Sequence, residues 1–259
     1  MENNLKIATP ISHLFENDNF SSQIIDLSDC LECRDHSLDK GFKKQELFHC
    51  DLQVIHKFST DDFNYLKEIK SNKKDLKLIS FHLASCYENP LIKKGIFYPQ
   101  GIKLSVQEMK NNASENIKKI KNIFGDQIHF SVENNNGYKT EAYDYVTDPD
   151  FIRSIVNDND INFLFDISHA KITAINTGVD FDVYLSKLPL NRINQIHISK
   201  EGFNLTGEVF DAHELPSHAE TKEILEFIQK YNTMKYITVE YYKDPFKLLD
   251  YLTKLKSII

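Results

Sequence analysis

Residues 127–166 decide the fold, and they read QIHFSVENNNGYKTEAYDYVTDPDFIRSIVNDNDINFLFD. The apolar runs Gln127–Glu133 and Asn162–Asp166 each predict a strand buried on both faces, because they are rich in Ile, Val, Leu and Phe. Between them, the spacing of apolar residues predicts an amphipathic helix over Pro149–Val156, with Asp148 suited as its N-cap and a proline as its first residue. A strand, a helix and a second strand in succession predict neighbouring strands of a parallel sheet.

The same alternation extends in both directions along the chain. Six further apolar runs predict strands, at Leu5–Thr9, Gln23–Leu27, Leu47–Ile55, Leu76–Leu83, Ile193–Ile198 and Tyr236–Glu240. Five further segments predict helices, at Thr60–Ser71, Ser105–Phe124, Phe181–Leu188, Ala219–Tyr231 and Pro245–Leu255. Eight strands in 259 residues predict a single (β/α)8 TIM barrel that forms one domain over residues 1–259. A doubly wound open sheet is disfavoured, because no G-x-G-x-x-G follows an early strand and no G-x-x-x-x-G-K-[ST] loop occurs.

The composition disfavours several classes of protein. The formal net charge of −7 argues against binding nucleic acid through the overall field of the molecule. No run of about 18 apolar residues predicts a membrane span, and the first residues lack a basic and then apolar signal, so we expect a cytoplasmic protein without a membrane partner. Four cysteines are too few for a disulfide scaffold, and the lone pair Cys30 and Cys33 is a weak metal signal.

Each of the last five predicted strands ends in, or next to, a residue type that binds metal ions. These residues are His82, Glu133, Asp166, His197 and Glu240. The carboxyl ends of all strands of a TIM barrel meet at one mouth, where the active site lies, so we expect these side chains to gather there. A single buried His or Asp is commonly a hydrogen-bonded core residue, but repetition over five strands is hard to explain by packing.

Other residues extend the set of candidate ligands. His169 follows Asp166 by three residues, and Asp211 and His213 form a D-x-H element after the seventh predicted strand. Imidazole and carboxylate groups together favour Fe, Mn, Zn or Co over Ca or Mg. Eight or nine ligands are too many for one ion, so we expect two or three ions.

Two positions in the first half of the chain are ambiguous. His49 lies within the third predicted strand, and His56 at the end of that strand is its rival as a ligand. Glu32, which follows the second predicted strand, is a candidate for a further polar contact with the site.

Three segments in succession carry a resemblance to a known family. They are Val132-Glu133-Asn134-Asn135, Leu164-Phe165-Asp166-Ile167-Ser168-His169, and a stretch from Tyr184-Leu185 through Leu188-Pro189-Leu190 to Gln195-Ile196-His197. Over about His49 to Pro245 the chain resembles the multinuclear non-haem iron-dependent oxidases, a branch of the xylose-isomerase-like TIM barrels. By motif, the resemblance implies the ligands His49, His82, Glu133, Asp166, His197, Asp211, His213 and Glu240.

The resemblance also implies an activity. Members of this family bind two or three iron ions, use O2 as co-substrate, and modify cysteine, or another residue, of ribosomally synthesised precursor peptides. They often act with a small partner protein that captures the leader of the peptide. We therefore expect an iron-dependent oxidoreductase with a precursor peptide and a leader-binding protein as partners.

The sequence departs from the family pattern at two positions. The family usually has two asparagines shortly after the strand-six aspartate, where this chain has Ser168-His169, so we include His169 among the expected ligands. The family often has a second histidine four residues after the strand-seven histidine, where this chain has Glu201. Whether Glu201 is a ligand, and how many ions bind, stays open at this point.

Other functions remain as alternatives. A phosphodiesterase resembling endonuclease IV shares the barrel and a multi-zinc cluster, but the net charge of −7 and the lack of an obvious basic, aromatic-interleaved groove disfavour it. A sugar isomerase is disfavoured because the chain has no Trp and lacks the usual Lys surroundings. A binding protein on a decayed barrel is disfavoured because the set of ligand types at the strand ends is intact.

Overall fold

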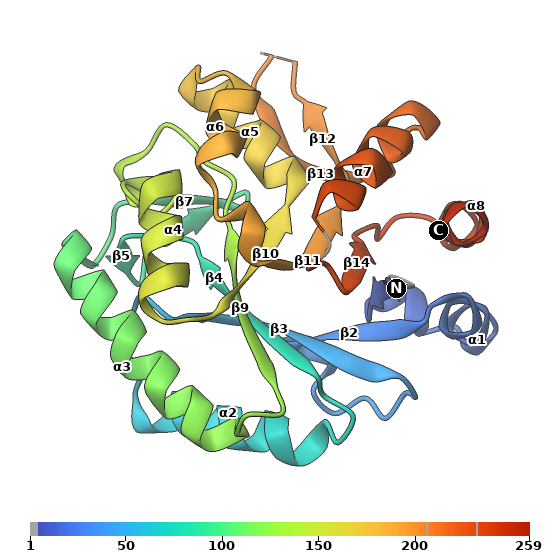
Figure 1. Ribbon diagram of the computed structural model, residues 1–259, viewed down its shortest axis with the longest axis horizontal. Helices are drawn as coiled ribbons and strands as arrows, with labels where there is room; N and C mark the ends of the chain where they lie inside the picture. The colour runs from blue at the N-terminus through green and yellow to red at the C-terminus, as the bar shows by residue number, and fades with distance from the viewer. Residues whose placement is uncertain (1–4, 206, 232) are drawn as a thin grey trace.

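Eight parallel strands form a closed barrel in the computed structural model, which describes residues 5–205, 207–231 and 233–259. The order around the barrel is β1-β14-β11-β10-β9-β4-β3-β2, and helices surround it (Figure 1). The barrel strands are β1 (Lys6–Pro10), β2 (Cys30–Arg34), β3 (Gln45–Gln53), β4 (Leu78–Leu83), β9 (His129–Asn134), β10 (Asn162–Asp166), β11 (Ile193–Ile198) and β14 (Tyr236–Val239). The predicted (β/α)8 TIM barrel is therefore confirmed.

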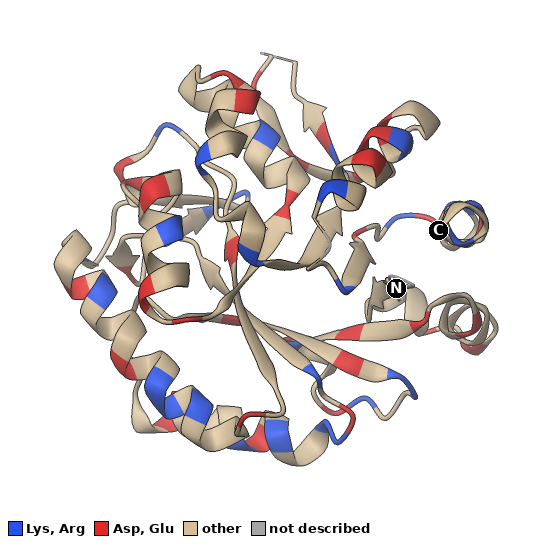
Figure 2. Cartoon of the chain, in the orientation of Figure 1, with Lys and Arg blue, Asp and Glu red and all other residues tan. Residues whose placement is uncertain are grey.

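The helices begin at capping residues that the sequence provides. They are α1 (Asp18–Leu27), α2 (Thr60–Asn72), α3 (Val106–Phe124), α4 (Pro149–Asp158), α5 (Ile167–Thr177), α6 (Phe181–Lys187), α7 (His218–Lys230) and α8 (Pro245–Ile258). The Asp148 carboxylate accepts a hydrogen bond from the N–H of Asp150 at 2.7 Å, which confirms the predicted start of α4. Acidic and basic residues are interleaved along the outer helices α2 and α3 (Figure 2). None of the helices in the described part of the chain has the length and apolar content that a membrane crossing requires.

Three small antiparallel pairs are inserted at the carboxyl ends of barrel strands. After β4, β5 (Tyr87–Glu88) pairs with β8 (Ile102–Lys103), and β6 (Leu91–Lys93) pairs with β7 (Ile96–Tyr98). After β11, β12 (Lys200–Phe203) pairs with β13 (Val209–Glu214). Short 3-10 helices complete the loops, at η1 (His13–Phe15), η2 (Asp35–Ser37), η3 (Glu141–Tyr143) and η4 (Leu190–Arg192).

The inside of the barrel is apolar at one end and polar at the other. Its floor is a buried cluster of Ala8, Cys30, Leu47, Leu78 and Tyr236. Side chains two residues apart in a strand share a face, and the next inward positions on four of these five strands are polar. They are Glu32 on β2, His49 on β3, Ser80 on β4 and Thr238 on β14. The alternate positions, such as Phe48, Phe81, Phe163 and Phe165, belong to the main hydrophobic core.

Two features of the sequence prediction are wrong. The apolar run Gln23–Leu27 is the second half of helix α1, which begins where the side chain of Asn17 accepts hydrogen bonds from two backbone N–H groups of the first turn. The second barrel strand is instead Cys30–Arg34, whose inward positions carry a thiol and two charges and so hide its strand character. Helix α5, which no prediction included, starts directly after β10 without a loop.

Candidate metal centre

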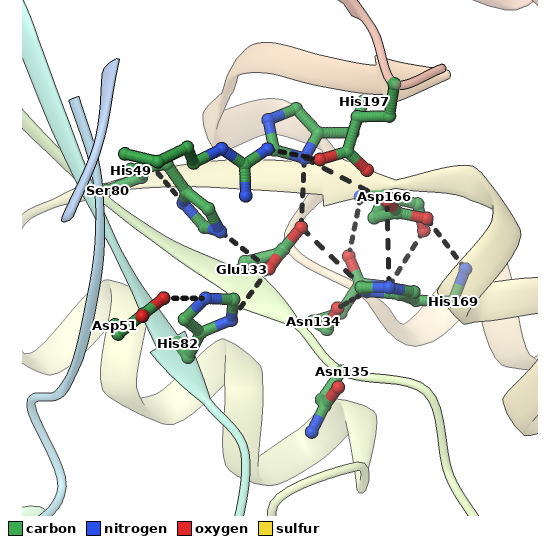
Figure 3. Close-up of polar contacts among 12 residues, drawn as sticks. His49, Asp51, Ser80, His82, Glu133, Asn134, Asn135, Asp166, His169 and His197 are labelled. Carbon is green, nitrogen blue, oxygen red and sulfur yellow. Dashed lines mark hydrogen bonds and ion pairs between the residues drawn. The ribbon is translucent and has the colours of Figure 1, made fainter. Parts of the chain in front are cut away.

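The carboxylate of Glu133, at the end of β9, lies at the centre of a cluster of imidazoles (Figure 3). Its Oε2 atom lies 3.3 Å from His49 Nε2 and 3.0 Å from His82 Nδ1. Its Oε1 atom lies 3.0 Å from His197 Nδ1 and 3.8 Å from His169 Nδ1. Glu133 is 1% exposed, so imidazole rings rather than solvent surround its carboxylate. A buried carboxylate with imidazole nitrogens near both oxygens is a donor set suited to Fe, Mn, Zn or Co.

Two of the imidazoles have a polar side chain next to the ring nitrogen that faces away from Glu133. His49 Nδ1 is hydrogen-bonded to Ser80 Oγ at 2.7 Å, which leaves Nε2 facing Glu133. His82 Nε2 lies 3.7 Å from the carboxylate of Asp51, which leaves Nδ1 facing Glu133. Metal-binding histidines in proteins are oriented in this way, with the second ring nitrogen donating to a neighbouring group.

The other two imidazoles show the same arrangement. His197 Nε2 lies 2.9 Å from Oε2 of the fully buried Glu32, so its Nδ1 faces Glu133. His169 Nδ1 lies 2.9 Å from the carbonyl oxygen of Asn134, so its Nε2 faces the Asp211 carboxylate at 3.3 Å. In all four rings, therefore, one nitrogen is occupied and the other points towards carboxylates.

Three carboxylates complete the mouth of the barrel beside Glu133. Asp166 Oδ1 accepts a hydrogen bond from the His169 N–H at 2.7 Å and so caps α5, while Oδ2 lies 3.9 Å from His197 Nδ1. Glu240, which follows β14, has Oε1 at 3.4 Å from His197 Nδ1. Asp211 lies 3.1 Å from His213 Nε2 as well as near His169. His213, on β13, has φ +45°, an uncommon conformation for a non-glycine residue.

The buried carboxylates and imidazoles of the cluster shift one another's pKa values. Burial raises the pKa of Asp166, His169 lowers it, and the nearby carboxylates of Glu240 and Glu133 raise it further, with the net effect well upward. Burial also disfavours the Glu133 anion, but His49, His197 and His82 together hold its pKa well below the ordinary value. Burial, the neighbouring His82 ring and Arg34 lower the pKa of His49 to about 4, so that ring is neutral and able to ligate.

The arrangement fits metal ions. The buried atom Asp166 Oδ2 has no hydrogen-bond partner in the described part of the chain, and the nearest imidazole nitrogens, of His169 and His197, lie 3.9 Å away. Each unpaired buried polar atom costs about 1–3 kcal/mol, and a shared cation removes that cost. Three groups within this part of the chain place their donor atoms within 4.8 Å of one another, namely His49–His82–Glu133, Glu133–Asp166–His169 and Glu32–His197–Glu240.

The group Glu32–His197–Glu240 already has a positively charged side chain of the protein beside it. Arg34, at the end of β2, places Nη2 2.7 Å from Glu32 Oε1 and also pairs with Oε1 of Glu240. The other oxygen of Glu32 is occupied by His197. Both oxygens of Glu32 are thus engaged by the protein, and its role is to orient His197. Burial disfavours the Glu32 anion, but His197 and Arg34 outweigh it and lower the pKa of Glu32 to about 2.

The structure brings all nine predicted ligands to one mouth. His49, His82, Glu133, Asp166, His169, His197, Asp211, His213 and Glu240 all take part in the contacts given above. The rival His56 points elsewhere, because its Nε2 lies 2.8 Å from the carbonyl oxygen of Ser85. Glu201 lies on β12 and is in none of the three groups found among the described residues.

Sequence reasoning missed Arg34 and Asp51. Arg34 is two residues after Glu32 and Asp51 two residues after His49, so the period of two along β2 and β3 would have placed both beside the site. The signal was lost for Arg34 because the second strand was assigned to the wrong segment.

A cavity of about 470 Å³ opens above the cluster. On one side it is lined by part of the cluster, including His49, His82, Glu133 and His169, and on another by Ile92, Gly95 and Phe97 of the β6–β7 hairpin. A second cavity of about 450 Å³, lined by Ser12, His36 and Tyr242 among others, adjoins it at Arg34 and Asp51. The first cavity has room for an amino-acid side chain directly above the donor atoms.

Fold and site together define a TIM barrel whose mouth is suited to more than one metal ion. The chain belongs to the family of RiPP precursor modification enzymes MbnB/TglH/ChrH, whose family model matches residues 56–258. A RiPP is a ribosomally synthesised and post-translationally modified peptide. The resemblance to this family of barrels is thereby confirmed, and Glu32, Arg34 and His49 lie before the matched segment.

Individual relatives are more distant. The chain is 23% identical over 131 residues to UPF0276 protein VP3015 of Vibrio parahaemolyticus, covering 48% of this chain and 44% of that protein. It is 22% identical over 157 residues to UPF0276 protein PA3283 of Pseudomonas aeruginosa, covering 60% of this chain and 52% of that protein. The chain thus spans about half the length of the curated relatives it matches.

Solved structures of sugar epimerases share the fold. The 3-keto-D-glucoside 4-epimerase YcjR of E. coli superposes with a TM-score of 0.61 at 13% identity, covering 98% of this chain and 99% of that chain. The D-psicose 3-epimerase of Clostridium cellulolyticum H10 superposes with a TM-score of 0.58 at 12% identity, covering 98% of both chains. At such low identity these likenesses establish the barrel alone.

Proposed function

We propose that this protein is a multinuclear non-haem iron-dependent oxidase that uses O2 to modify a cysteine, or another residue, of a ribosomally synthesised precursor peptide. The observation that carries the proposal is the Glu133 carboxylate, which has His49 and His82 beside one oxygen and His197 beside the other, each from a different barrel strand. Membership of a family of RiPP precursor modification enzymes supports the peptide substrate. A small leader-binding protein is the proposed partner.

We assign the candidate ligands to two or three sets, of which the first is one of the three compact groups given above. His49, His82 and one oxygen of Glu133 form the first set. The other oxygen of Glu133 with His197 and Asp166 forms the second set, and Glu240, whose Oε1 also pairs with Arg34, lies beside it. A third set consists of His169, Asp211 and His213, where an imidazole stands in place of the amide usual in the family. Iron bound by these sets would supply coordination for a substrate thiolate and electrons for the reduction of O2.

The rest of the site is suited to hold a peptide residue and to keep the ligands in place. The cavity has room for the reacting side chain, and Ile92 and Phe97 add apolar surface to its lining. Ser80, Glu32 and the carbonyl oxygen of Asn134 fix the orientation of three imidazoles, so that the ring nitrogens are in place before metal binds. Such preorganisation is what a metal centre of defined geometry requires.

The proposal is tested by the metal content and the reaction of the protein. The protein is purified without oxygen, its metals are quantified, and O2 consumption is followed with a cysteine-containing peptide, with and without a candidate leader-binding protein. We expect two or three equivalents of iron and O2 uptake that depends on the peptide. Iron well below one equivalent, together with tightly bound zinc and phosphodiesterase activity, would refute the oxidase.

Matched variants test the ligands. Asp166→Asn removes a charge but keeps the oxygen that caps α5, and His197→Ala removes an imidazole. We expect both variants to remain folded and to lose iron, whereas His218→Ala, which removes an exposed histidine, keeps it. Full iron content and activity in both ligand variants would contradict the assignments.

A further inference from the structure

The outer strand of the β6–β7 hairpin has an open edge. In the described part of the chain, β6 pairs with β7 alone, in the register Leu91 with Tyr98, Ile92 with Phe97 and Lys93 with Ile96. The connecting residues Lys94 and Gly95 both have positive φ, at +50° and +77°, which fits a tight two-residue hairpin turn. The residues that flank such a turn form a hydrogen-bonded pair, so the N–H and C=O of Ile92, one position further, point away from β7. The edge of β6 is therefore open to another strand.

The inner strand of this hairpin is fixed to the body of the protein. The N–H of Phe97 donates to the Tyr143 hydroxyl at 3.0 Å, and the carbonyl oxygen of Phe97 accepts from Thr140 Oγ1 at 2.7 Å. Figure 1 shows β7 near the ends of β4 and β9, which bear His82 and Glu133. The open edge is thus held in a set position beside the mouth of the barrel.

One face of the hairpin is part of the metal cavity. Ile92 and Phe97 form a cross-strand pair on that face, and both line the cavity together with His82 and Glu133. Ile92 is nevertheless 58% exposed, a large value for an apolar side chain at a cavity rim. A chain lying along β6 covers Ile92 and remains in continuous contact with the cavity.

The tip of the hairpin carries uncompensated positive charge. Lys93 and Lys94 have no acidic partner within the described residues, and Lys93 Nζ lies 5.9 Å from the ring centre of Tyr98. Lys103 on the neighbouring β8 is by contrast paired with Asp144 and Glu141. An acidic group on a bound chain fits beside the unpaired lysines.

We propose that the edge of β6 binds an extended, acidic segment of the substrate peptide, adjacent to the residue that enters the metal cavity. The segment adds a strand to the hairpin through the outward main-chain groups of Ile92, a common mode of peptide recognition. An apolar side chain of the segment contacts Ile92, and an acidic one lies near Lys93 and Lys94. The inference rests on the proposed function, because it assumes that the substrate is a peptide.

Binding is measured without the reaction, so that failure of the inference is distinct from failure of the proposed function. Two fluorescent peptides carry alanine in place of the reactive cysteine and differ only in having two glutamates or two lysines beside it. We expect the wild type to bind the glutamate peptide roughly 3- to 5-fold more tightly, as exposed ion pairs allow. The double variant Lys93→Glu/Lys94→Glu should reverse this preference. Equal affinities for the two peptides in both proteins would overturn the inference, even if iron and O2 uptake are as proposed.

A second pair of variants tests the main-chain contact. Ile92→Pro removes the outward N–H without breaking the pairing of β6 with β7, whereas Ile92→Val keeps the N–H and an apolar side chain. We expect weaker binding of the glutamate peptide by the proline variant and near wild-type binding by the valine variant. Equal binding by both variants, or dimerisation of the peptide-free wild type that Ile92→Pro abolishes, would overturn the assignment of β6 to the peptide.

Discussion

Replacing Glu32 by Gln should weaken metal binding although Glu32 is not itself a proposed ligand. Glu32 is fully buried, and its two oxygens contact His197 Nε2 at 2.9 Å and Arg34 Nη2 at 2.7 Å. A glutamine in this place has one acceptor oxygen and one NH2 group. The oxygen accepts a hydrogen bond from one of these two donors, but the NH2 group cannot accept one from the other donor. Loss of the carboxylate that orients a ligating histidine typically costs 10–100-fold in metal affinity, or about 1.4–2.7 kcal/mol.

The assay is a competition between the protein and a chelator of known affinity. Glu46→Gln is the matched control, because Glu46 is paired with Lys6 at 2.7 Å at the other end of the barrel. The Glu32 variant should bind metal about 10–100-fold more weakly than both the wild type and the control. Wild-type metal affinity in Glu32→Gln, with its folding confirmed by thermal unfolding, would refute the role of Glu32 in orienting His197.

Three further outcomes follow from the structure. His169→Asn, which restores the amide usual in the family, should lower metal affinity at the Asp211 side by about 10-fold, as measured by metal titration; unchanged stoichiometry and affinity would contradict a ligand role for His169. Gly101→Ala should destabilise the insertion after β4 more than Gly95→Ala does in thermal unfolding, because both residues have positive φ but only at Gly101 would the new Cβ meet the Glu88 carbonyl oxygen, at 2.1 Å. A chelator should lower the melting temperature, since metal at 100 times its Kd stabilises the fold by about 2.7 kcal/mol; a melting temperature independent of chelator would show that the carboxylates need no ion.

The sequence was sufficient to predict the barrel and the nine residues at its mouth. Strand ends of a parallel barrel share one edge, so the order of ligand types along the chain already places Glu133, Asp166 and His197 together. The orientation of His49 required the structure, because a residue inside a strand points to either face until its register with β4 is known.

The rest of the site depends on long-range contacts that a local pattern does not contain. Arg34 meets Glu240 across 206 residues of sequence, and no spacing rule connects them. Strand β2 was missed because a short apolar run such as Gln23–Leu27 fits a strand or a helix equally well, and the cap at Asn17 decides for the helix. Helix α5 was missed because Asp166 both ends β10 and caps the helix that follows.

The most direct test of the central claim is a crystal structure of the protein purified without oxygen, with anomalous diffraction measured on both sides of the iron absorption edge. We expect at least two iron peaks that flank the Glu133 carboxylate, one beside His49 and His82 and one beside His197 and Asp166. A single peak, or peaks that persist below the iron edge as zinc or another metal, would contradict a multinuclear iron centre bridged by Glu133.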